Sequence, residues 1–356
     1  NGLVSIGKEF AMVAVFYTVF VLFGAMGFGE GAFPFYPIIV VVIMALGYDR
    51  MTGAGVAIIG STVGFASGLV NMFTTGISQS IVGLPLFSGI GYRIVGLIVF
   101  YVIGLAYIYM YAKKIKKDPS KSINRDEFIN QKTSNEKAER TELNTQRILG
   151  LLGFLVLIAF QGYGAINWGW GLAQISGIYV IFSIFVGVVF KLGPSEVSMR
   201  ITKGAERVLG AALAIGLARS IMVLLNSGNI IDTFIYYMSE SLTGQGPALT
   251  LLVIYLSVTL FNFFVVSGSG KAMLMMPILS PLGNLLGINQ QVMVLAYQYG
   301  DGLTNNIWPG GAMVAVALCG VDYGDWIKYS WKIFLTMIVS GYGLILVAHA
   351  IGYGPF

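Results

Sequence analysis

The chain has 356 residues, of which 56% are hydrophobic and only 10% are charged, and its mean hydropathy is +0.79. A soluble domain carries more charge than this, whereas a bundle of membrane helices is apolar and rich in glycine, of which the chain has 47. One cysteine and one histidine exclude an internal disulfide and a cysteine metal cluster, and leave little for a histidine metal site. We therefore expect an integral membrane protein that is not an enzyme.

The apolar segments of the first half, residues 1–112, predict three elements. Two apolar arms with Glu30 at the glycine-rich bend between them form a helical hairpin, and a helix interrupted by the polar string LVNMFTTG follows. A long helix then ends in a tyrosine cluster that is typical of a membrane interface. We assign the hairpin to residues 9–47, the broken helix to 51–86 and the long helix to 94–112.

Residues 113–147 are polar and of mixed charge, and they hold ten of the 21 lysines and arginines. This composition predicts a solvated linker between two halves. The second half, 148–356, begins with helices and a basic loop at 191–207, and then repeats the order of the first half. We assign a hairpin to 247–287, a broken helix to 291–320 and a last helix to 327–350.

The basic residues orient the chain in the membrane, because loops rich in lysine and arginine stay in the cytoplasm. With the linker 113–147 inside, residues 191–207 and 321–332 also fall inside, while 161–171 and 226–246 fall outside. The number of membrane crossings agrees with these sides only if both hairpins are re-entrant, that is, return to the side from which they enter, and open towards opposite sides. We expect a multi-pass protein of a prokaryotic cytoplasmic (inner) membrane.

The two halves resemble each other weakly. A shift of 240 residues pairs Phe23 with Phe263, Ala32 with Ala272, Pro37 with Pro277, Ile38 with Ile278, Leu46 with Leu286 and Gly47 with Gly287. The two polar breaks also align, with Asn71 on Asn305. Inverted repeats that meet at broken helices are a design of secondary transporters. The second hairpin follows about 100 residues of its half and the first almost none, so we expect a missing N-terminal segment of roughly that length with two or more helices.

Four long strings carry a resemblance to a known family. FNFFVVSGSGKAMLMMPILSPLGNLLGI, VLAYQYGDGLTNNIWP, GAFPFYPIIVVVIMALGYDRMTG and NMFTTGISQSIVGLPLFSGIGYR together resemble the YfcC branch of the DcuC family, four-carbon dicarboxylate anaerobic carriers of the ion transporter superfamily. The resemblance implies two scaffold bundles, two re-entrant hairpins, two broken helices, an elevator-like movement of the hairpin domain and a homodimer. Branches of the family are described as dicarboxylate carriers or as basic amino acid exchangers, so the match leaves the solute open.

The candidate site lies at the second hairpin tip and at the two breaks. Small residues at the tip let amides of a helix N-terminus approach a carboxylate, and asparagine and threonine at the breaks offer groups to a cation or a polar solute. Close packing of the tip and capping of helix ends are the alternatives. The predicted site residues are Ser267, Gly268, Ser269, Gly270 and Lys271 at the tip, Asn71, Thr74 and Thr75 at the first break, Asp301, Thr304, Asn305 and Asn306 at the second, and Glu30 at the first tip.

Charged side chains inside a membrane are costly and are functional candidates. Glu30 and Lys271 are neighbours in the repeat alignment, so they could form an ion pair, contact the solute or both, although Glu30 could instead lie at the outer surface. Asp301 could bind a cation, carry a proton or meet a substrate ammonium, and a salt bridge or a helix cap are its structural alternatives. Arg219, within a helix, could pair with an acidic residue.

We expect a secondary active transporter, an antiporter or an ion-coupled symporter, of a small carboxylate-bearing solute. Amino acids such as arginine and ornithine are slightly favoured because Glu30 and Asp301 could meet a cationic group, and a four-carbon dicarboxylate is the alternative. A channel or an intramembrane enzyme is an alternative of another class, but neither a continuous polar lining nor a nucleophile with its base is visible.

The expected partners are the small solute, the lipid bilayer and a second copy of the chain, and no nucleic acid is expected. We expect no cofactor and no bound metal other than a coupling ion, for which Na+ or H+ are both open and Na+ would lie near Asn71 or Asn305. The ammonium of Lys271 lies where a coupling Na+ could sit, so it favours exchange over Na+ symport.

Overall fold

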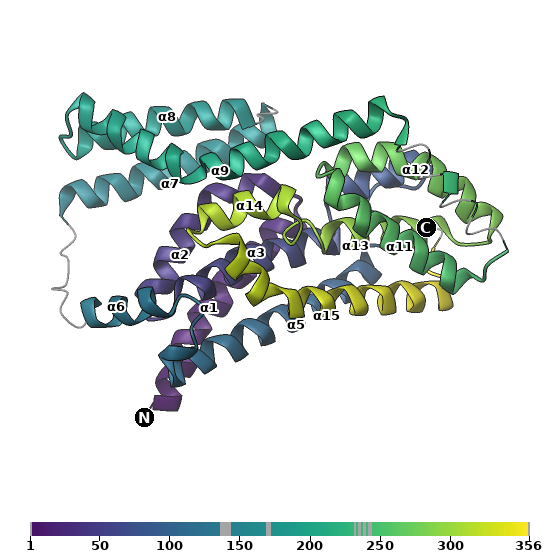
Figure 1. The fold of residues 1–356 in the computed structure, drawn as a ribbon, viewed down its shortest axis with the longest axis horizontal. Helices are drawn as coiled ribbons and strands as arrows, with labels where there is room; N and C mark the ends of the chain where they lie inside the picture. Colours follow the sequence, from purple (N-terminus) through teal and green to yellow (C-terminus); the bar gives the residue numbers. More distant parts are fainter. Residues whose placement is uncertain are drawn as a thin grey trace. The chain divides into compact units, whose positions relative to one another are not determined.

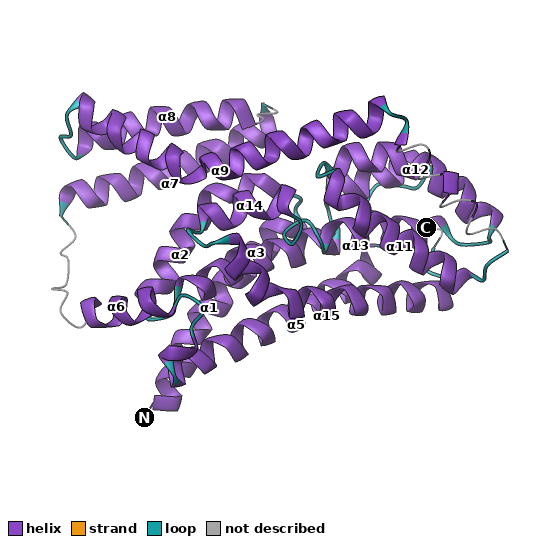
Figure 2. Cartoon of the chain, in the orientation of Figure 1, coloured by secondary structure: helices purple, strands orange, loops and turns teal. Residues whose placement is uncertain are grey.

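The computed structural model describes residues 2–135, 144–168, 172–230, 233, 236–237, 240 and 244–354. Within these residues every regular element is a helix and no strand occurs (Figure 1 and Figure 2). The chain divides into two units, one formed by Asn1–Asn130 with Ala211–Phe356 and the other by Gln131–Gly210. The all-α fold class that the sequence predicts is confirmed.

The N-terminal part of the first unit contains a helix pair, an interrupted helix and a long helix. The helix pair is α1 (Gly2–Ala25) and α2 (Tyr36–Ala45), joined by the 3-10 turn η1 (Gly29–Phe35). The interrupted helix is α3 (Arg50–Ser67), the π-helical turn η2 (Met72–Gly76) and α4 (Ile77–Ile81). The long helix α5 (Ile90–Lys117) is followed by η3 (Pro119–Lys121) and α6 (Arg125–Asn135).

The C-terminal part of the first unit repeats this order of elements. A helix pair is formed by α11 (Pro247–Phe264) and α12 (Gly268–Leu285), an interrupted helix by α13 (Gln290–Gly302) and α14 (Pro309–Leu318), and a long helix by α15 (Tyr323–Ala350). The helices α5 and α15 run side by side (Figure 1). The two interruptions fall at the two polar strings that the sequence singles out.

The second unit contains α7 (Thr145–Asn167), α8 (Leu172–Val189) and the beginning of α9 (Pro194–Ser227), a helix that continues into the first unit. The prediction of a basic loop at 191–207 is wrong for most of this range, because α9 already begins at Pro194. Proline at the first position of a helix loses no hydrogen bond there, so this residue starts the helix instead of ending the previous segment.

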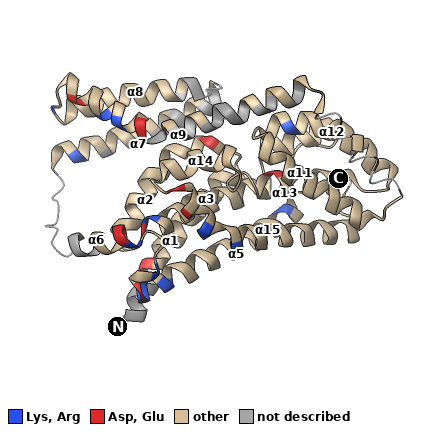
Figure 3. Ribbon diagram, in the orientation of Figure 1, with Lys and Arg blue, Asp and Glu red and all other residues tan. Residues whose placement is uncertain are grey.

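Four stretches of the described residues are long and apolar enough to cross a membrane: Arg50–Ile81, Ile90–Lys117, Pro247–Phe264 and Tyr323–Ala350. In Figure 3 most of the ribbon of α11, α12, α13 and α15 is free of charged residues, whereas charges colour the ribbon around α6 and the start of α1. This distribution is that of a membrane protein with solvated ends.

Capping residues set the two ends of α3. Asp49 accepts a hydrogen bond from the backbone N–H of Thr52 at 2.8 Å at the start of α3. Gly68 ends the same helix in the left-handed conformation, with φ of +62°, which a residue with a side chain rarely adopts. The α-helix therefore stops at Ser67, well inside the apolar stretch, and leaves a polar segment within the fold.

The helices α1 and α3 cross at glycines. A Cβ atom built on Gly64 would lie 1.9 Å from the carbonyl oxygen of Val21, and one built on Gly24 would lie 2.2 Å from the carbonyl oxygen of Ser61. Small residues of this kind let two membrane helices approach until their backbones touch. The crossing fixes the first helix pair against the first interrupted helix.

The start of the predicted linker is packed against the first unit. Asp49 accepts hydrogen bonds from the hydroxyl groups of Tyr111 and Ser122, both at 2.6 Å, and Glu127 forms an ion pair with Arg50. Phe128 is only 1% exposed. The prediction of a solvated linker from residue 113 is therefore wrong for its first part, because α5 continues to Lys117 and the segment after it is anchored by polar and apolar contacts.

Candidate functional site

The tip between α11 and α12 is built around the N-terminus of α12. Ser267 caps this helix, since its Oγ accepts a hydrogen bond from the backbone N–H of Gly270 at 3.2 Å. The hydroxyl group of Tyr297 on α13 donates a hydrogen bond of 2.6 Å to the carbonyl oxygen of Gly268. The tip is thus held to α13, and Lys271 follows in the first turn of α12.

Lys271 and Asp301 form a buried ion pair. The distance from Lys271 Nζ to Asp301 Oδ1 is 2.6 Å, and both side chains are 0% exposed. The same ammonium donates to Asn262 Oδ1 at 2.5 Å and to the carbonyl oxygen of Val265 at 3.2 Å. The ammonium therefore makes two hydrogen bonds in addition to its ion pair. Lys271 and Asp301, which lie 30 residues apart in an otherwise uncharged stretch of the sequence, thus pair with each other.

Asn262 is the residue that connects the helix pair to the second break. Its Nδ2 lies 2.9 Å from each of three acceptors, the carbonyl oxygen of Asp301, Thr304 Oγ1 and Asn305 Oδ1. Asn305 Nδ2 in turn donates to Asp301 Oδ2 at 3.4 Å. The sequence reasoning missed Asn262, although an amide within the apolar string FNFF is a signal of a buried polar contact.

The first break leaves two buried polar groups without a hydrogen-bond partner. Asn71 Oδ1 accepts from the backbone N–H groups of Phe73 and Thr74 at 3.0 and 3.3 Å, but Asn71 Nδ2 and Thr74 Oγ1 have no partner. Both residues are 0% exposed. Buried polar groups are almost always hydrogen-bonded in folded proteins, so groups without a partner mark a place where a ligand could bind.

The first break also contacts α13. Thr75 Oγ1 lies 2.9 Å from Gln298 Oε1, and Gln298 Nε2 donates to the carbonyl oxygen of Phe65 at 2.7 Å. A Cβ atom built on Gly302 would lie 2.5 Å from the Cα of Ala66. The two interrupted helices therefore touch next to their breaks. Gln298 is a second residue that the sequence reasoning missed.

Gly268 joins the tip to both breaks. A Cβ atom built on Gly268 would lie 2.7 Å from Thr74 Cγ2 of the first break and 3.2 Å from Asp301 Oδ2 of the second. Thr74, the N-terminus of α12 and the Asp301 carboxylate thus meet at one junction. We call the group of Asn71, Thr74, Gly268, Lys271 and Asp301 the junction cluster.

The remaining predicted residues take different places. Thr304 and Asn305 belong to the Asn262 network, whereas Asn306 donates to Thr62 Oγ1 at 2.7 Å and accepts from the indole N–H of Trp326 through its carbonyl oxygen. Ser269 Oγ lies 3.4 Å from Ser267 Oγ. Asn306 therefore holds the second break to neighbouring helices, and Ser269 belongs to the tip.

Glu30 does not pair with Lys271. It is exposed on η1, while Lys271 is fully buried and pairs with Asp301. The prediction that Glu30 and Lys271 could form an ion pair is wrong, because the carboxylate of Asp301 on α13 neutralises the ammonium of Lys271. The end of α1 does contact the first break: the carbonyl oxygen of Ala25 accepts a hydrogen bond from the backbone N–H of Val70 at 3.2 Å, and a Cβ atom built on Gly27 would lie 3.0 Å from Asn71 Oδ1. The side chain of Arg219 lies outside the described residues.

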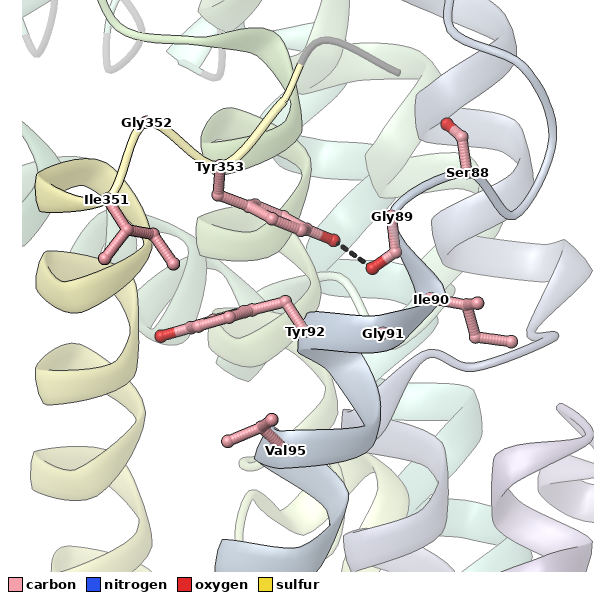
Figure 4. A pocket seen from close by; sticks show the side chains of 9 residues that line it. All are labelled: Ser88, Gly89, Ile90, Gly91, Tyr92, Val95, Ile351, Gly352 and Tyr353. Atoms are coloured by element: carbon pink, nitrogen blue, oxygen red, sulfur yellow. Dashed lines mark hydrogen bonds between the residues drawn. The ribbon is translucent and has the colours of Figure 1, made fainter.

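An open pocket of 710 Å³ lies between the start of α5 and the end of α15. Figure 4 shows Tyr92 and Tyr353 in its wall, with the Tyr353 hydroxyl donating to the carbonyl oxygen of Gly89 at 2.5 Å. Its lining residues carry no charge, and none of them belongs to the junction cluster. It offers nothing to neutralise a carboxylate, so it is a poor candidate for the solute site.

No group of three or more histidine, cysteine, aspartate or glutamate side chains that could hold a metal ion occurs among the residues that the structure describes. The single cysteine, Cys319, is free and buried. The junction cluster itself supplies polar groups and one charge pair.

The fold is similar to that of the YdaH transporter of Alcanivorax borkumensis, whose crystal structure was described as having an unusual topology. The TM-score is 0.51 at 14% sequence identity, and the match covers 99% of this chain and 84% of that chain. The fold is thus that of a membrane transporter.

The chain belongs to the DcuC family, described as C4-dicarboxylate anaerobic carriers, whose sequence pattern matches residues 5–350. YfcC of Escherichia coli, provisionally named a basic amino acid antiporter, is 32% identical over 98% of this chain and 71% of its own length. An uncharacterised protein of Haemophilus influenzae is 30% identical over 96% of this chain and 68% of its own length. The predicted resemblance is confirmed, and the family consists of transporters and not of enzymes.

Proposed function

We propose that the chain is a secondary active transporter that exchanges small carboxylate-bearing solutes across a prokaryotic inner membrane, with amino acids such as arginine and ornithine favoured over four-carbon dicarboxylates. The observation that carries this proposal is the buried Lys271–Asp301 pair at 2.6 Å beside the tip. Charged groups at membrane depth are costly, and in transporters they mark solute and ion pathways.

The charge of the pair suits a zwitterion. An α-carboxylate can share the ammonium of Lys271 while an α-ammonium shares the carboxylate of Asp301, so neither buried charge loses a counter-charge when the solute binds or leaves. A dicarboxylate would bring two negative charges to a junction whose lysine is already neutralised. For this reason the amino acid remains the first candidate and the dicarboxylate the second.

The unpartnered donors support a carboxylate at the same place. Asn71 Nδ2 is a donor only, and Thr74 Oγ1 can donate through its hydroxyl hydrogen. The N-terminus of α12 faces Thr74 across Gly268, and the dipole of a helix favours negative charge at its N-terminus. The tip, the first break and Asp301 therefore offer groups for both ends of an amino acid.

The two helix pairs are proposed to be re-entrant hairpins of an inverted repeat, and the unit that contains them to move as an elevator relative to a scaffold. The division of the chain into two units supports this, because one unit holds both helix pairs and both interrupted helices. We also propose a homodimer, as the resemblance to the family implies. H+ and Na+ are the two candidate coupling ions.

Counterflow in proteoliposomes tests the proposal. Liposomes loaded with unlabelled arginine, ornithine or a four-carbon dicarboxylate are given a trace of the labelled solute outside. We expect saturable uptake that the internal amino acid accelerates, and its loss in Asp301→Asn. Uptake that only an internal dicarboxylate accelerates would identify the four-carbon dicarboxylate as the solute instead of the amino acid. Uptake that internal solute does not accelerate would indicate a channel.

A further inference from the structure

The ammonium of Lys271 lies in a cage of three oxygen atoms. The oxygens are a side-chain amide oxygen at 2.5 Å, a main-chain carbonyl oxygen at 3.2 Å and a carboxylate oxygen at 2.6 Å, from Asn262, Val265 and Asp301. Carboxylate, amide and backbone carbonyl oxygens are also the ligands that hard metal cations take in proteins. The oxygen cage thus has the ligand types of a cation site, and a covalently attached cation fills it.

Each oxygen of the cage is positioned without help from the ammonium. Asn262 is oriented by the bonds that its Nδ2 donates to the second break, and Val265 ends α11 with its N–H bonded to Phe261 at 2.9 Å. Asp301 belongs to α13 and receives a hydrogen bond from Asn305 at 3.4 Å. Removal of the ammonium therefore leaves a formed oxygen cage with one net negative charge.

The first half of the chain has no matching cation. The position that the repeat alignment pairs with Lys271 is Gly31, and Glu30 beside it is exposed. At the first break, Asn71 Oδ1 is occupied by backbone N–H groups, and the free atoms are the Asn71 amide nitrogen and the Thr74 hydroxyl. Among the described residues, a cation at a helix-pair tip is thus found in the second half alone; the buried Arg93 of the first half lies on α5.

We propose that Lys271 is a resident substitute for a coupling alkali cation, so that the exchange by this chain is independent of Na+, and that removal of its ammonium converts the cage into a Na+ site. This inference rests on the proposed function for its statement about exchange, but the statement about the cage stands separately. The Lys271 ammonium permanently links the second helix pair to Asp301 beside the second break. A Na+ ion would make this link only while it is bound.

Thermal unfolding of the purified protein in detergent tests the cage. Na+ and N-methyl-D-glucamine chlorides are compared at equal ionic strength for the wild type, for Lys271→Ala and for Lys271→Ala/Asp301→Asn. A cation that binds only the folded state raises its melting temperature, so we expect a saturable Na+-specific rise of a few degrees for Lys271→Ala. No Na+-specific rise is expected for the wild type or for the double variant, whose cage has lost its charge.

Lys271→Met provides a second variant that keeps the volume of the side chain. Its stem fills the cage without a charge, so we expect no Na+-specific rise. In proteoliposomes, exchange by the wild type is expected to be equal in Na+ and in N-methyl-D-glucamine, and any residual exchange by Lys271→Ala to increase about tenfold with Na+, within the usual range of coupling between ligands.

The two possible failures are distinguishable. A Na+-specific rise in the wild type, or an equal rise in Lys271→Ala and the double variant, would overturn the inference about the cage even if counterflow of amino acids is observed. Absence of amino acid counterflow with the expected melting pattern would instead overturn the proposed function and leave the Na+ site of the variant in place. If Lys271→Ala is recovered folded only in Na+, the inference is supported.

Discussion

At the scale of single residues, the buried pair of Lys271 and Asp301 dominates the site. Each charge is 0% exposed, and removal of one partner leaves the other uncompensated in a medium that solvates it poorly. A buried pair of this kind contributes little net stability compared with an apolar pair of the same volume. Folding stability alone therefore does not account for the pair, which agrees with the role in solute handling proposed above.

A double-mutant cycle tests the coupling of this pair. In buffer without Na+, Lys271→Met and Asp301→Asn are each expected to lower the free energy of unfolding by about 3–5 kcal/mol, because each leaves one buried charge. The double variant should lose clearly less than the sum of the single losses. Thermal unfolding measures all four proteins. Additive losses would show that the two side chains do not interact as the 2.6 Å distance indicates.

The sequence identified the charged members of the site but not their pairing. Lys271 and Asp301 stand out because they are the only charges between Ser241 and Val321. The repeat alignment placed Lys271 beside Glu30, since an alignment shows which positions correspond and not which ones meet in space. Asn262 and Gln298 were missed because an amide in an apolar helix signals a buried polar contact but does not identify the groups that it contacts.

At the scale of elements, the crossing of α1 and α3 is set by glycine. Space for a side chain is absent at Gly64, where a Cβ atom would meet the Val21 carbonyl oxygen at 1.9 Å. By contrast, a Cβ atom built on Gly343 of α15 would meet no heavy atom within 4 Å apart from its chain neighbours and the nearby backbone of its own helix, and Gly343 has an ordinary φ. The two positions form a matched pair for testing the crossing.

We expect Gly64→Ala to lower the free energy of unfolding by about 1–3 kcal/mol, the usual effect of overpacking, because α1 must move away from α3. Gly343→Ala should be neutral or should stabilise the helix by up to about 1 kcal/mol, since alanine is the better helix former. Melting temperatures in detergent give the comparison. Equal effects of the two substitutions would contradict the close approach of α1 and α3.

The order of the elements could be predicted better than their bounds. Polar strings inside apolar runs located both interruptions, because a lipid-facing helix excludes such residues. The long helix α9 was cut short, since its first turns are polar and a composition of this kind also suits a loop. The anchoring of Ser122 and Phe128 could not be foreseen either, because a hydroxyl and an aromatic ring in a polar linker identify no partner.

At the scale of the whole molecule, the orientation in the membrane follows from the positions of the basic residues and remains a prediction. The only cysteine is buried, so a reporter cysteine can be introduced without strong background labelling. Asn130, beyond the anchored start of the linker, and Gln245, before α11, are both exposed and suit this purpose.

In a Cys319→Ala background, Gln245→Cys is expected to react with a membrane-impermeant maleimide in intact cells. Asn130→Cys should react only after the cells are opened, because loops rich in lysine and arginine remain in the cytoplasm. The fraction of labelled protein after immunoprecipitation is the measurement. Labelling of both positions in intact cells, in a culture whose cytoplasmic control protein stays unlabelled, would contradict the orientation.

The contact between α3 and α13 also constrains how relatives of this chain can diverge. Gly302 fits against Ala66, and Gln298 reaches Phe65 and Thr75, so each interrupted helix is shaped to the other. A substitution on one side that adds volume or removes an amide is tolerated only with a compensating change on the other. Paired changes at these positions are therefore expected between lineages, and a chimaera of two relatives should accumulate in the membrane only when both helices come from the same parent.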